Sequence, residues 1–457
     1  MTGQTPFSRM SLPAGPWSTA SGSSPGECQP AFSERLLPVS ARANTVDGQL
    51  AAVPLWMSVP MLYVDANKLR TAGIDFSTPP SSLAELLDWS STLVSTGAST
   101  HGLAFTEACG ALVADHLMPL TGGVLIQPDN GRSQRGQRVA ITEEQVQLLA
   151  EELELLKSSV ERDHALYLSP DPTGFSDLLA ISDPETDAAM AVHTSAALQP
   201  VLDAVDTLYQ GIDVALLPIP GGGTVGTTSL WMLSSTDQAV ATLAWPLADW
   251  LTTNEHLAEW SAATALVSPA VGSVGTPVLQ AAWAAQPRLR APHDAIAAVP
   301  DVASSISLVV GPWLQAMTSR SRMCTSVVNG EVEPDVAVRT FLDDVNNAID
   351  AYEMARIDSP PSASSTLQLA VSCENGAEIA GVWIQAARSA SGFAARSDDG
   401  TYAFTLDSGG AFAAHVGCGD DGGRWVSTEW SPILLGSRGE LTCSGRPTVV
   451  PGVCTLL

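Results

Sequence analysis

Three consecutive glycines at 221–223 form the most distinctive run of residues that could carry chemistry. A glycine-rich turn cradles a phosphate when it ends in Gly-Lys-Ser or Gly-Lys-Thr. Here the run continues into Thr224, and the two lysines of the chain, Lys68 and Lys157, lie elsewhere. The chain also has no G-x-S-x-G motif, no H-E-x-x-H motif and no C-x-x-C pair. We therefore expect a protein that is not an enzyme and that needs no cofactor.

Four of the seven cysteines lie near the C-terminus, and two kinds of chemistry could use them. Cys373, Cys418, Cys443 and Cys454 could form disulfides, or three of them could bind zinc together with His415, which makes an H-x-x-C pair. Disulfides have fewer geometric requirements. We expect one or two among the four, with the pairing open, and no metal. Disulfides favour an exported, oxidising compartment.

Three tryptophans of the same region, Trp383, Trp425 and Trp430, allow two interpretations. Their flat rings could form a platform that stacks on a carbohydrate. Tryptophan is also a common core residue of small β domains, and we prefer the core interpretation.

Composition narrows the classes of partner. The 457 residues carry a formal net charge of −27, and 45% of them are hydrophobic. Such a chain forms packed domains and repels nucleic acid, so we expect no nucleic-acid partner. It contains no apolar run long enough to span a membrane, and its first residues lack the basic and apolar regions of a signal peptide.

The elements that must position these residues divide the chain into four parts. Residues 1–31 are rich in Ser, Gly and Pro and predict a disordered tail. Residues 32–357 have an α/β pattern, with capping boxes at Ser82/Glu85 and Thr142/Gln145 that begin helices. The stretch 358–366 has the composition of a linker. Residues 367–457 alternate short apolar segments with turns, which predicts a small β sandwich.

Four segments resemble, in order and spacing, the extracellular solute-binding proteins of bacterial ABC importers. The family includes the glycerol-3-phosphate-binding and maltose-binding proteins. The segments are DGQLAAVPLWMSVPMLYVDANKLRTAGIDFSTPPSSLAELLDWSSTLVSTG (47–97), SDPETDAAMAVHTSAAL (182–198), DVALLPIPGGGTVGTTSLWMLSSTDQAVATLAWPLADWLTTNEHLAEWSAATALVSP (213–269) and GPWLQAMTSRSRMCTSVVNGEVEPDVAVRTFLDDVNNAIDAYE (311–353). The resemblance implies a type II periplasmic-binding-protein-like fold of two lobes, followed here by a small all-β domain.

In that family the solute lies between the lobes, held by hydroxyl groups, backbone groups and aromatic faces. The resemblance implies eight ligand-binding residues at the matching positions of this chain: Trp56, Ser58, Thr194, Ser195, Ser229, Trp231, Gly311 and Trp313. Each could instead pack in the hinge or the core. His193, next to Thr194, is more typical of a turn or core residue than of a ligand.

The resemblance also implies a function: capture of a sugar or polyol outside the cell by lobe closure, and delivery to the ABC permease membrane subunits by a monomer. Two alternatives stay open. The chain could be a surface or scaffold protein that binds no solute, or an inactive remnant of a binding protein. The C-terminal β domain could instead be a secreted carbohydrate-binding module.

Two departures from the family matter. Phosphate-binding members have an arginine where this chain has Val309, which predicts a neutral ligand. The family also begins with strands and helices of the first lobe ahead of the position of Asp47. The sequence therefore predicts an incomplete first lobe and a truncated or misassigned gene product.

Overall fold

The computed structural model describes residues 32–456. Gaps fall at 106–122, 135, 140, 164, 169–174, 206, 232–237, 359–364, 374–375, 377, 387–390, 407–410, 419–423, 428–430, 433–437 and 444–453. The predicted tail, most of the predicted linker and Trp430 lie outside these residues. None of the helices in the described ranges has the length and apolar character needed to cross a lipid bilayer.

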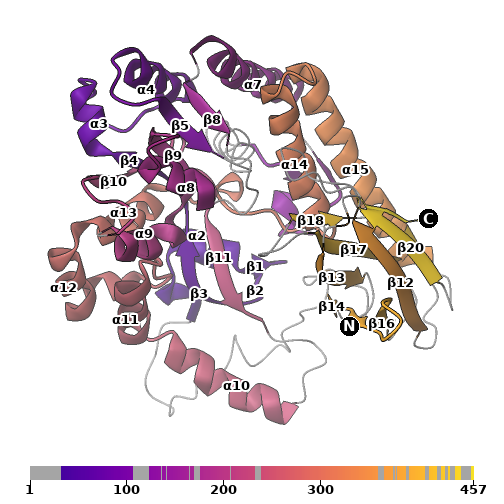
Figure 1. The fold of residues 1–457 in the computed structure, drawn as a ribbon. Helices are drawn as coiled ribbons and strands as arrows, with labels where there is room; N and C mark the ends of the chain where they lie inside the picture. Colours follow the sequence, from indigo (N-terminus) through magenta and orange to yellow (C-terminus); the bar gives the residue numbers. More distant parts are fainter. Residues whose placement is uncertain are drawn as a thin grey trace, which may run out of the picture.

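A five-stranded sheet forms the centre of one lobe (Figure 1). Its order is β10 (Val214–Pro218), β4 (Pro60–Asp65), β9 (Ala188–Thr194), β5 (His101–Phe105) and β8 (Leu166–Leu168). The pairs β10–β4 and β4–β9 are antiparallel, whereas β9–β5 and β5–β8 are parallel. Strand β4 is apolar on both faces: Leu62 and Val64 belong to one core cluster, and Met61 and Tyr63 belong to the other. A strand covered on both sides needs such a continuous apolar run.

Helices cover both faces of this sheet. The first core cluster joins it to α4 (Leu83–Ser95), α7 (Glu143–Asp163), α14 (Trp313–Val328) and α15 (Pro334–Asp358). The second joins it to α8 (Phe175–Ser182), α9 (Leu198–Ala204) and α13 (Ala291–Ala298). Helix α3 (Ala66–Thr71) follows β4 directly.

Both predicted helix starts are confirmed. The Thr142 hydroxyl accepts a hydrogen bond from the Gln145 amide, and the Gln145 side chain accepts one from the Thr142 amide. The Ser82 hydroxyl caps α4 by accepting from the Glu85 amide. The Glu85 carboxylate, however, accepts from Ser81 instead of Ser82, so this box is displaced by one residue.

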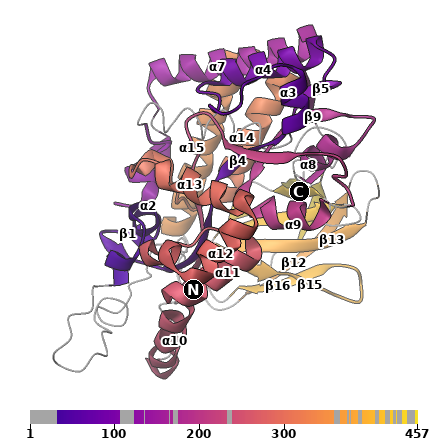
Figure 2. The ribbon, with the colours of Figure 1, turned by 90° about the vertical axis from the view of Figure 1, so that its left-hand side faces the viewer.

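The second lobe carries a two-stranded sheet of β3 (Val53–Ser58) and β11 (Gly226–Leu230) in the described residues. Around it lie α2 (Pro38–Ala43), α10 (Gln238–Leu251), α11 (Asn254–Thr264) and α12 (Pro277–Ala285) (Figure 1). Figure 2 shows α10, α11 and α12 one above another in this lobe. Strand β11 ends at Leu230. The truncation of the gene product stays a prediction.

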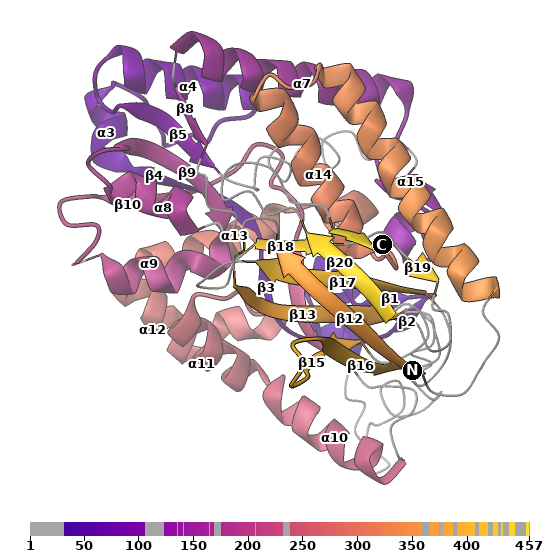
Figure 3. The same cartoon turned by 45° about the vertical axis from the view of Figure 1, so that its right-hand side comes forward.

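The C-terminal part forms two further sheets that share one core. One has the order β15 (Ala395–Arg396), β16 (Tyr402–Leu406), β12 (Ser365–Cys373), β20 (Arg438–Cys443) and β21 (Cys454–Leu456). The other has β14 (Gly392–Phe393), β13 (Ile379–Ala386), β17 (Ala411–Cys418) and β18 (Arg424–Ser427), with β19 (Ser431–Pro432) beside β17. These sheets lie next to α14 and α15 (Figure 3). The exact domain boundaries stay a prediction.

A disulfide joins Cys373 of β12 to Cys418 of β17 and so links the two C-terminal sheets. This bond confirms the expectation of a disulfide in this region. Cys443 and Cys454 are paired in the backbone register of β20 and β21. Cys324 of α14, which the sequence did not single out, is also disulfide-bonded.

We predict that the substitution Cys373→Ser lowers the free energy of unfolding of the C-terminal sheets by about 2–4 kcal/mol, because the open chain gains conformational entropy. Urea unfolding followed by hydrogen exchange in β13 and β17 would measure the loss. The exposed Ser391→Ala change is a control for the same sheets. Equal stability of the two variants would contradict the prediction.

Candidate ligand-binding site

The chain passes between the two lobes for the first time at Val59, which separates β3 from β4. The Val59 amide donates to the Ser195 hydroxyl at 3.1 Å, and the Ser195 amide donates to the Val59 carbonyl at 2.8 Å. Val59 and Ser195 are both almost fully buried. Ser195 therefore satisfies both backbone groups of the residue that connects the lobes.

The second crossing joins β10 to β11 through the glycine run. Gly221, Gly222 and Gly223 have φ values of 70°, 77° and 67°, a left-handed backbone that favours glycine. A Cβ atom on Gly223 would lie 2.9 Å from the Pro60 ring. The run is thus a sharp, close-packed turn, and it places Thr224 between the lobes.

The third crossing runs from Ala303 to Pro312, ahead of α14. Asn130 holds it: the Asn130 side chain donates to the Ala303 carbonyl at 2.9 Å, and the Asn130 carbonyl accepts from the Val309 amide at 2.8 Å. Val225 also bridges to Ile306, so the second and third crossings are adjacent.

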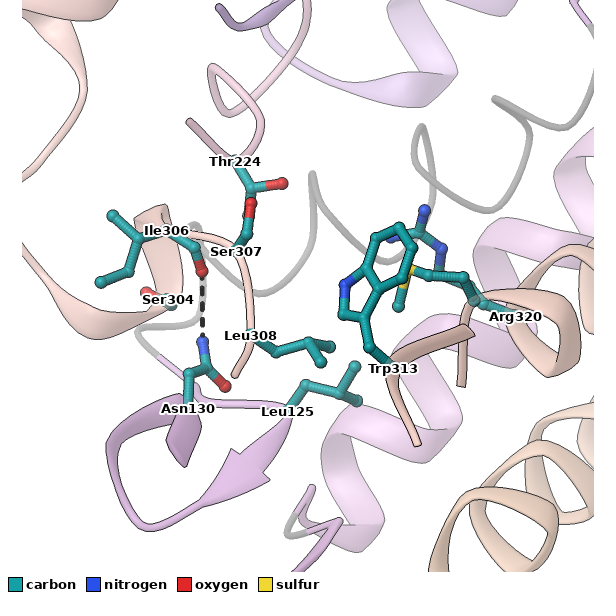
Figure 4. A pocket seen from close by; sticks show the side chains of 10 residues that line it. Leu125, Asn130, Thr224, Ser304, Ile306, Ser307, Leu308, Trp313 and Arg320 are labelled. Carbon is teal, nitrogen blue, oxygen red and sulfur yellow. Dashed lines mark hydrogen bonds between the residues drawn. The ribbon is translucent and has the colours of Figure 1, made fainter. Parts of the chain in front are cut away.

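A cavity of about 140 Å³ opens where these crossings meet (Figure 4). Trp313 and Arg320 of α14 lie on one side of it, and Thr224 and Ser307 lie on the other. The remaining lining residues are Leu125, Asn130, Ser304, Ile306, Leu308 and Met317. An indole face, hydroxyl groups and one guanidinium are suited to a small polar ligand that has an apolar side.

The structure brings only Trp313 of the predicted site residues into this cavity. Its side chain is 47% exposed. Gly311 lies two residues earlier and is packed against α15, because a Cβ atom on it would lie 2.3 Å from the Tyr352 ring. There is therefore no room for a side chain at position 311, and ligand contact by Gly311 stays a prediction.

The residues predicted on the two strands of the second lobe have other contacts. Trp56 stacks on Trp260 with ring centroids 5.3 Å apart. Ser58 pairs with Gly226 in the strand register, and the Ser229 hydroxyl donates to the Asn44 side chain at 2.6 Å. The strand register shifts between Thr228 and Ser229, and Trp231 lies beyond the end of β11.

Thr194 and Ser195 lie at the end of β9 and are engaged in local structure. The Thr194 hydroxyl accepts from the Ala196 amide, and its carbonyl accepts from the Tyr63 hydroxyl. Burial lowers the pKa of the preceding His193 to about 4, so this ring is neutral near pH 7. Ligand contact by these residues, and by the four on β3 and near β11, stays a prediction.

Sequence reasoning missed most of the cavity lining. Met317 and Arg320 follow Trp313 at intervals of four and seven residues, which places all three on one helix face. That spacing could have identified them. Asn130, Ser304 and Ser307 offered no such signal, since they reach the cavity through contacts distant in sequence.

The architecture is therefore that of a two-lobed binding protein: adjacent chain crossings join the lobes, and a cavity lies where the crossings meet. The sequence profile of the bacterial extracellular solute-binding proteins matches residues 21–290, more than half of the chain. The chain therefore belongs to the bacterial extracellular solute-binding protein family. A search of curated proteins found no match.

Solved structures with a similar fold include UgpB from Mycobacterium tuberculosis in complex with glycerophosphocholine. It has a TM-score of 0.55 at 13% identity, over 71% of this chain and 76% of that one. The sugar-binding protein MalE from Xanthomonas citri gives 0.53 at 15% identity, with 72% and 78% covered. The GacH receptor of Streptomyces glaucescens, solved unliganded and with acarbose, gives 0.52 at 17%, with 70% and 76% covered. The predicted two-lobed α/β fold class is confirmed.

We predict that Ser195→Ala lowers the free energy of unfolding by about 1–3 kcal/mol without any ligand present, because it leaves the buried Val59 amide without an acceptor. Ser159→Ala is the control, since the Ser159 hydroxyl donates to the Leu155 carbonyl in an exposed hydrogen bond and serves as acceptor for no buried crossing amide in the described residues. The control should change stability by less than about 0.5 kcal/mol. Urea unfolding curves that coincide for the two variants would show that Ser195 does not hold the crossing.

Proposed function

We propose that this protein is the extracytoplasmic solute-binding component of an ABC importer and that it captures a neutral sugar or polyol between its lobes. It would act by binding and not by catalysis, as a monomer that presents its bound solute to the permease membrane subunits. The main support is the cavity at the meeting point of the crossings, lined by Trp313 and hydroxyl groups. A ligand there would contact both lobes and favour their closure.

The residues around the cavity are consistent with a sugar as ligand. The Trp313 indole could stack on the apolar face of a sugar ring, while Thr224 and Ser307 could hydrogen-bond to its hydroxyls. Proteins of similar fold have been solved with acarbose and with glycerophosphocholine. A micromolar dissociation constant, which corresponds to a binding free energy of about −8 kcal/mol, would be sufficient for such uptake.

We predict that Trp313→Ala weakens sugar binding at least tenfold, as expected for a truncated aromatic anchor in a binding pocket. Calorimetric titration with maltose and with glycerol would measure the change in dissociation constant. Trp250→Ala is the control, because Trp250 is 54% exposed on α10, outside the cavity. Equal losses in both variants would contradict the proposed site.

The same titrations, repeated with a Trp383→Ala variant, distinguish the proposed function from two alternatives: a carbohydrate-binding module in the C-terminal part and a protein that binds no solute. Trp383 of β13 lies edge-on to Phe393, which is 64% exposed. Binding that depends on Trp383 and not on Trp313 would favour a carbohydrate-binding module in the C-terminal part. Absence of binding across a broad sugar panel would favour a protein that does not bind solutes.

We predict that a neutral sugar binds more tightly than glycerol-3-phosphate. Val309 is buried and carries no charge where phosphate-binding relatives have arginine, and the net charge of −27 repels anions. Competition between maltose and glycerol-3-phosphate at low salt would test this, with Arg320→Gln as the variant that removes the cavity's guanidinium. A preference for the phosphate ester that Arg320→Gln abolishes would show that Arg320 replaces the missing donor.

A further inference from the structure

A side chain of the C-terminal sheets makes a hydrogen bond to the third crossing. The Gln385 amide nitrogen on β13 donates to the Gly311 carbonyl at 3.0 Å. His415 of the neighbouring strand β17 lies with its Nε2 atom 3.2 Å from the Gln385 amide oxygen. Trp383 is directly opposite His415 in the register, so Gln385 and His415 are diagonal neighbours on one face.

The chemistry of the groups fixes the direction of this chain of hydrogen bonds. The Gly311 carbonyl can only accept, so the Gln385 NH₂ group must face it. The Gln385 oxygen then faces His415 and accepts from its Nε2–H. His415 is 2% exposed, and burial lowers its pKa to about 4, so the ring is neutral near pH 7.

The backbone around Gly311 is also held at two further points. The Tyr352 ring of α15 lies so close that no side chain could replace the glycine hydrogen. Just upstream, the Val309 carbonyl packs against Gly131, where a Cβ atom would lie 1.9 Å from the oxygen. Leu308 and Trp313 both line the cavity. The contacts described here therefore limit the movement of the backbone between them.

We propose that the C-terminal sheets are a positioning element of the binding site, and that Gln385 fixes the Gly311 carbonyl and thereby the Trp313 wall of the cavity. This inference rests on the proposed function for its effect on affinity. Gln385 and His415 do not line the cavity themselves. The protein would thus bind its ligand through two lobes whose geometry a third unit stabilises.

The first test needs no ligand. Gln385→Met keeps the length of the side chain and removes both hydrogen bonds. We expect amide hydrogen exchange in a peptide covering 308–316 to become about five- to tenfold faster in the full-length protein, since a hydrogen bond of this kind makes a modest net contribution. Gln280→Met is the matched control, because Gln280 also donates to a backbone carbonyl, that of Val274, on the surface of α12. The Gln280→Met change should leave the hydrogen-exchange rate of the 308–316 peptide unchanged.

A role of Gln385 confined to its own sheet would give the opposite pattern. Exchange would then rise in β13 and β17 and stay unchanged over 308–316, and the inference would be overturned.

The second test uses maltose, or whichever sugar of the panel the wild-type protein binds. Gln385→Met should weaken that sugar about five- to tenfold, and Gln280→Met should not. Unchanged affinity in Gln385→Met would overturn the inference. If the wild-type protein binds no sugar, the proposed function fails, and the exchange experiment still decides whether Gln385 holds the crossing.

Discussion

Burial of strand β4 on both of its faces is the constraint from which the arrangement of the lobes follows. Met61, Leu62, Tyr63 and Val64 are all fully buried, with alternate residues in different core clusters. Tight packing on both sides fixes the strand's position. Because β4 continues through Val59 into β3, it also fixes where the second lobe begins. Ser195 can bind both backbone groups of Val59 only because β9 is the register partner of β4.

The candidate site is built from the connections between the lobes, not from their centres. Thr224 follows the glycine turn, Ser307 and Leu308 belong to the third crossing, and Trp313 begins α14 directly after it. Such segments have few backbone partners of their own, so side chains from elsewhere must hold them. Asn130 does so from one side and Gln385 from another. The added C-terminal sheets are therefore in contact with the same segment that lines the cavity.

Local patterns in the sequence predicted much of the fold. The Thr142/Gln145 box and the short alternating segments near the C-terminus each carry their signal within a few residues. The order of four segments was enough to indicate the family. The site was harder to predict because its residues meet through distant contacts. Trp313 was identified by its position, whereas Asn130 and Arg320 were missed and Ser195 proved to bind Val59. Trp231, which the resemblance placed on a strand facing the ligand, lies beyond the end of β11.

The unequal lengths of the first two crossings have a mechanical consequence. One residue spans at most about 3.6 Å, so the lobes cannot separate at Val59. The connection over 219–225 is longer and includes three glycines in a left-handed conformation. Any rotation of one lobe against the other must therefore have its axis close to Val59, with the second crossing absorbing the change in backbone angles. Displacements increase with distance from that axis, so α10, at the far edge of its lobe in Figure 1, would sweep a longer arc than the residues around the cavity.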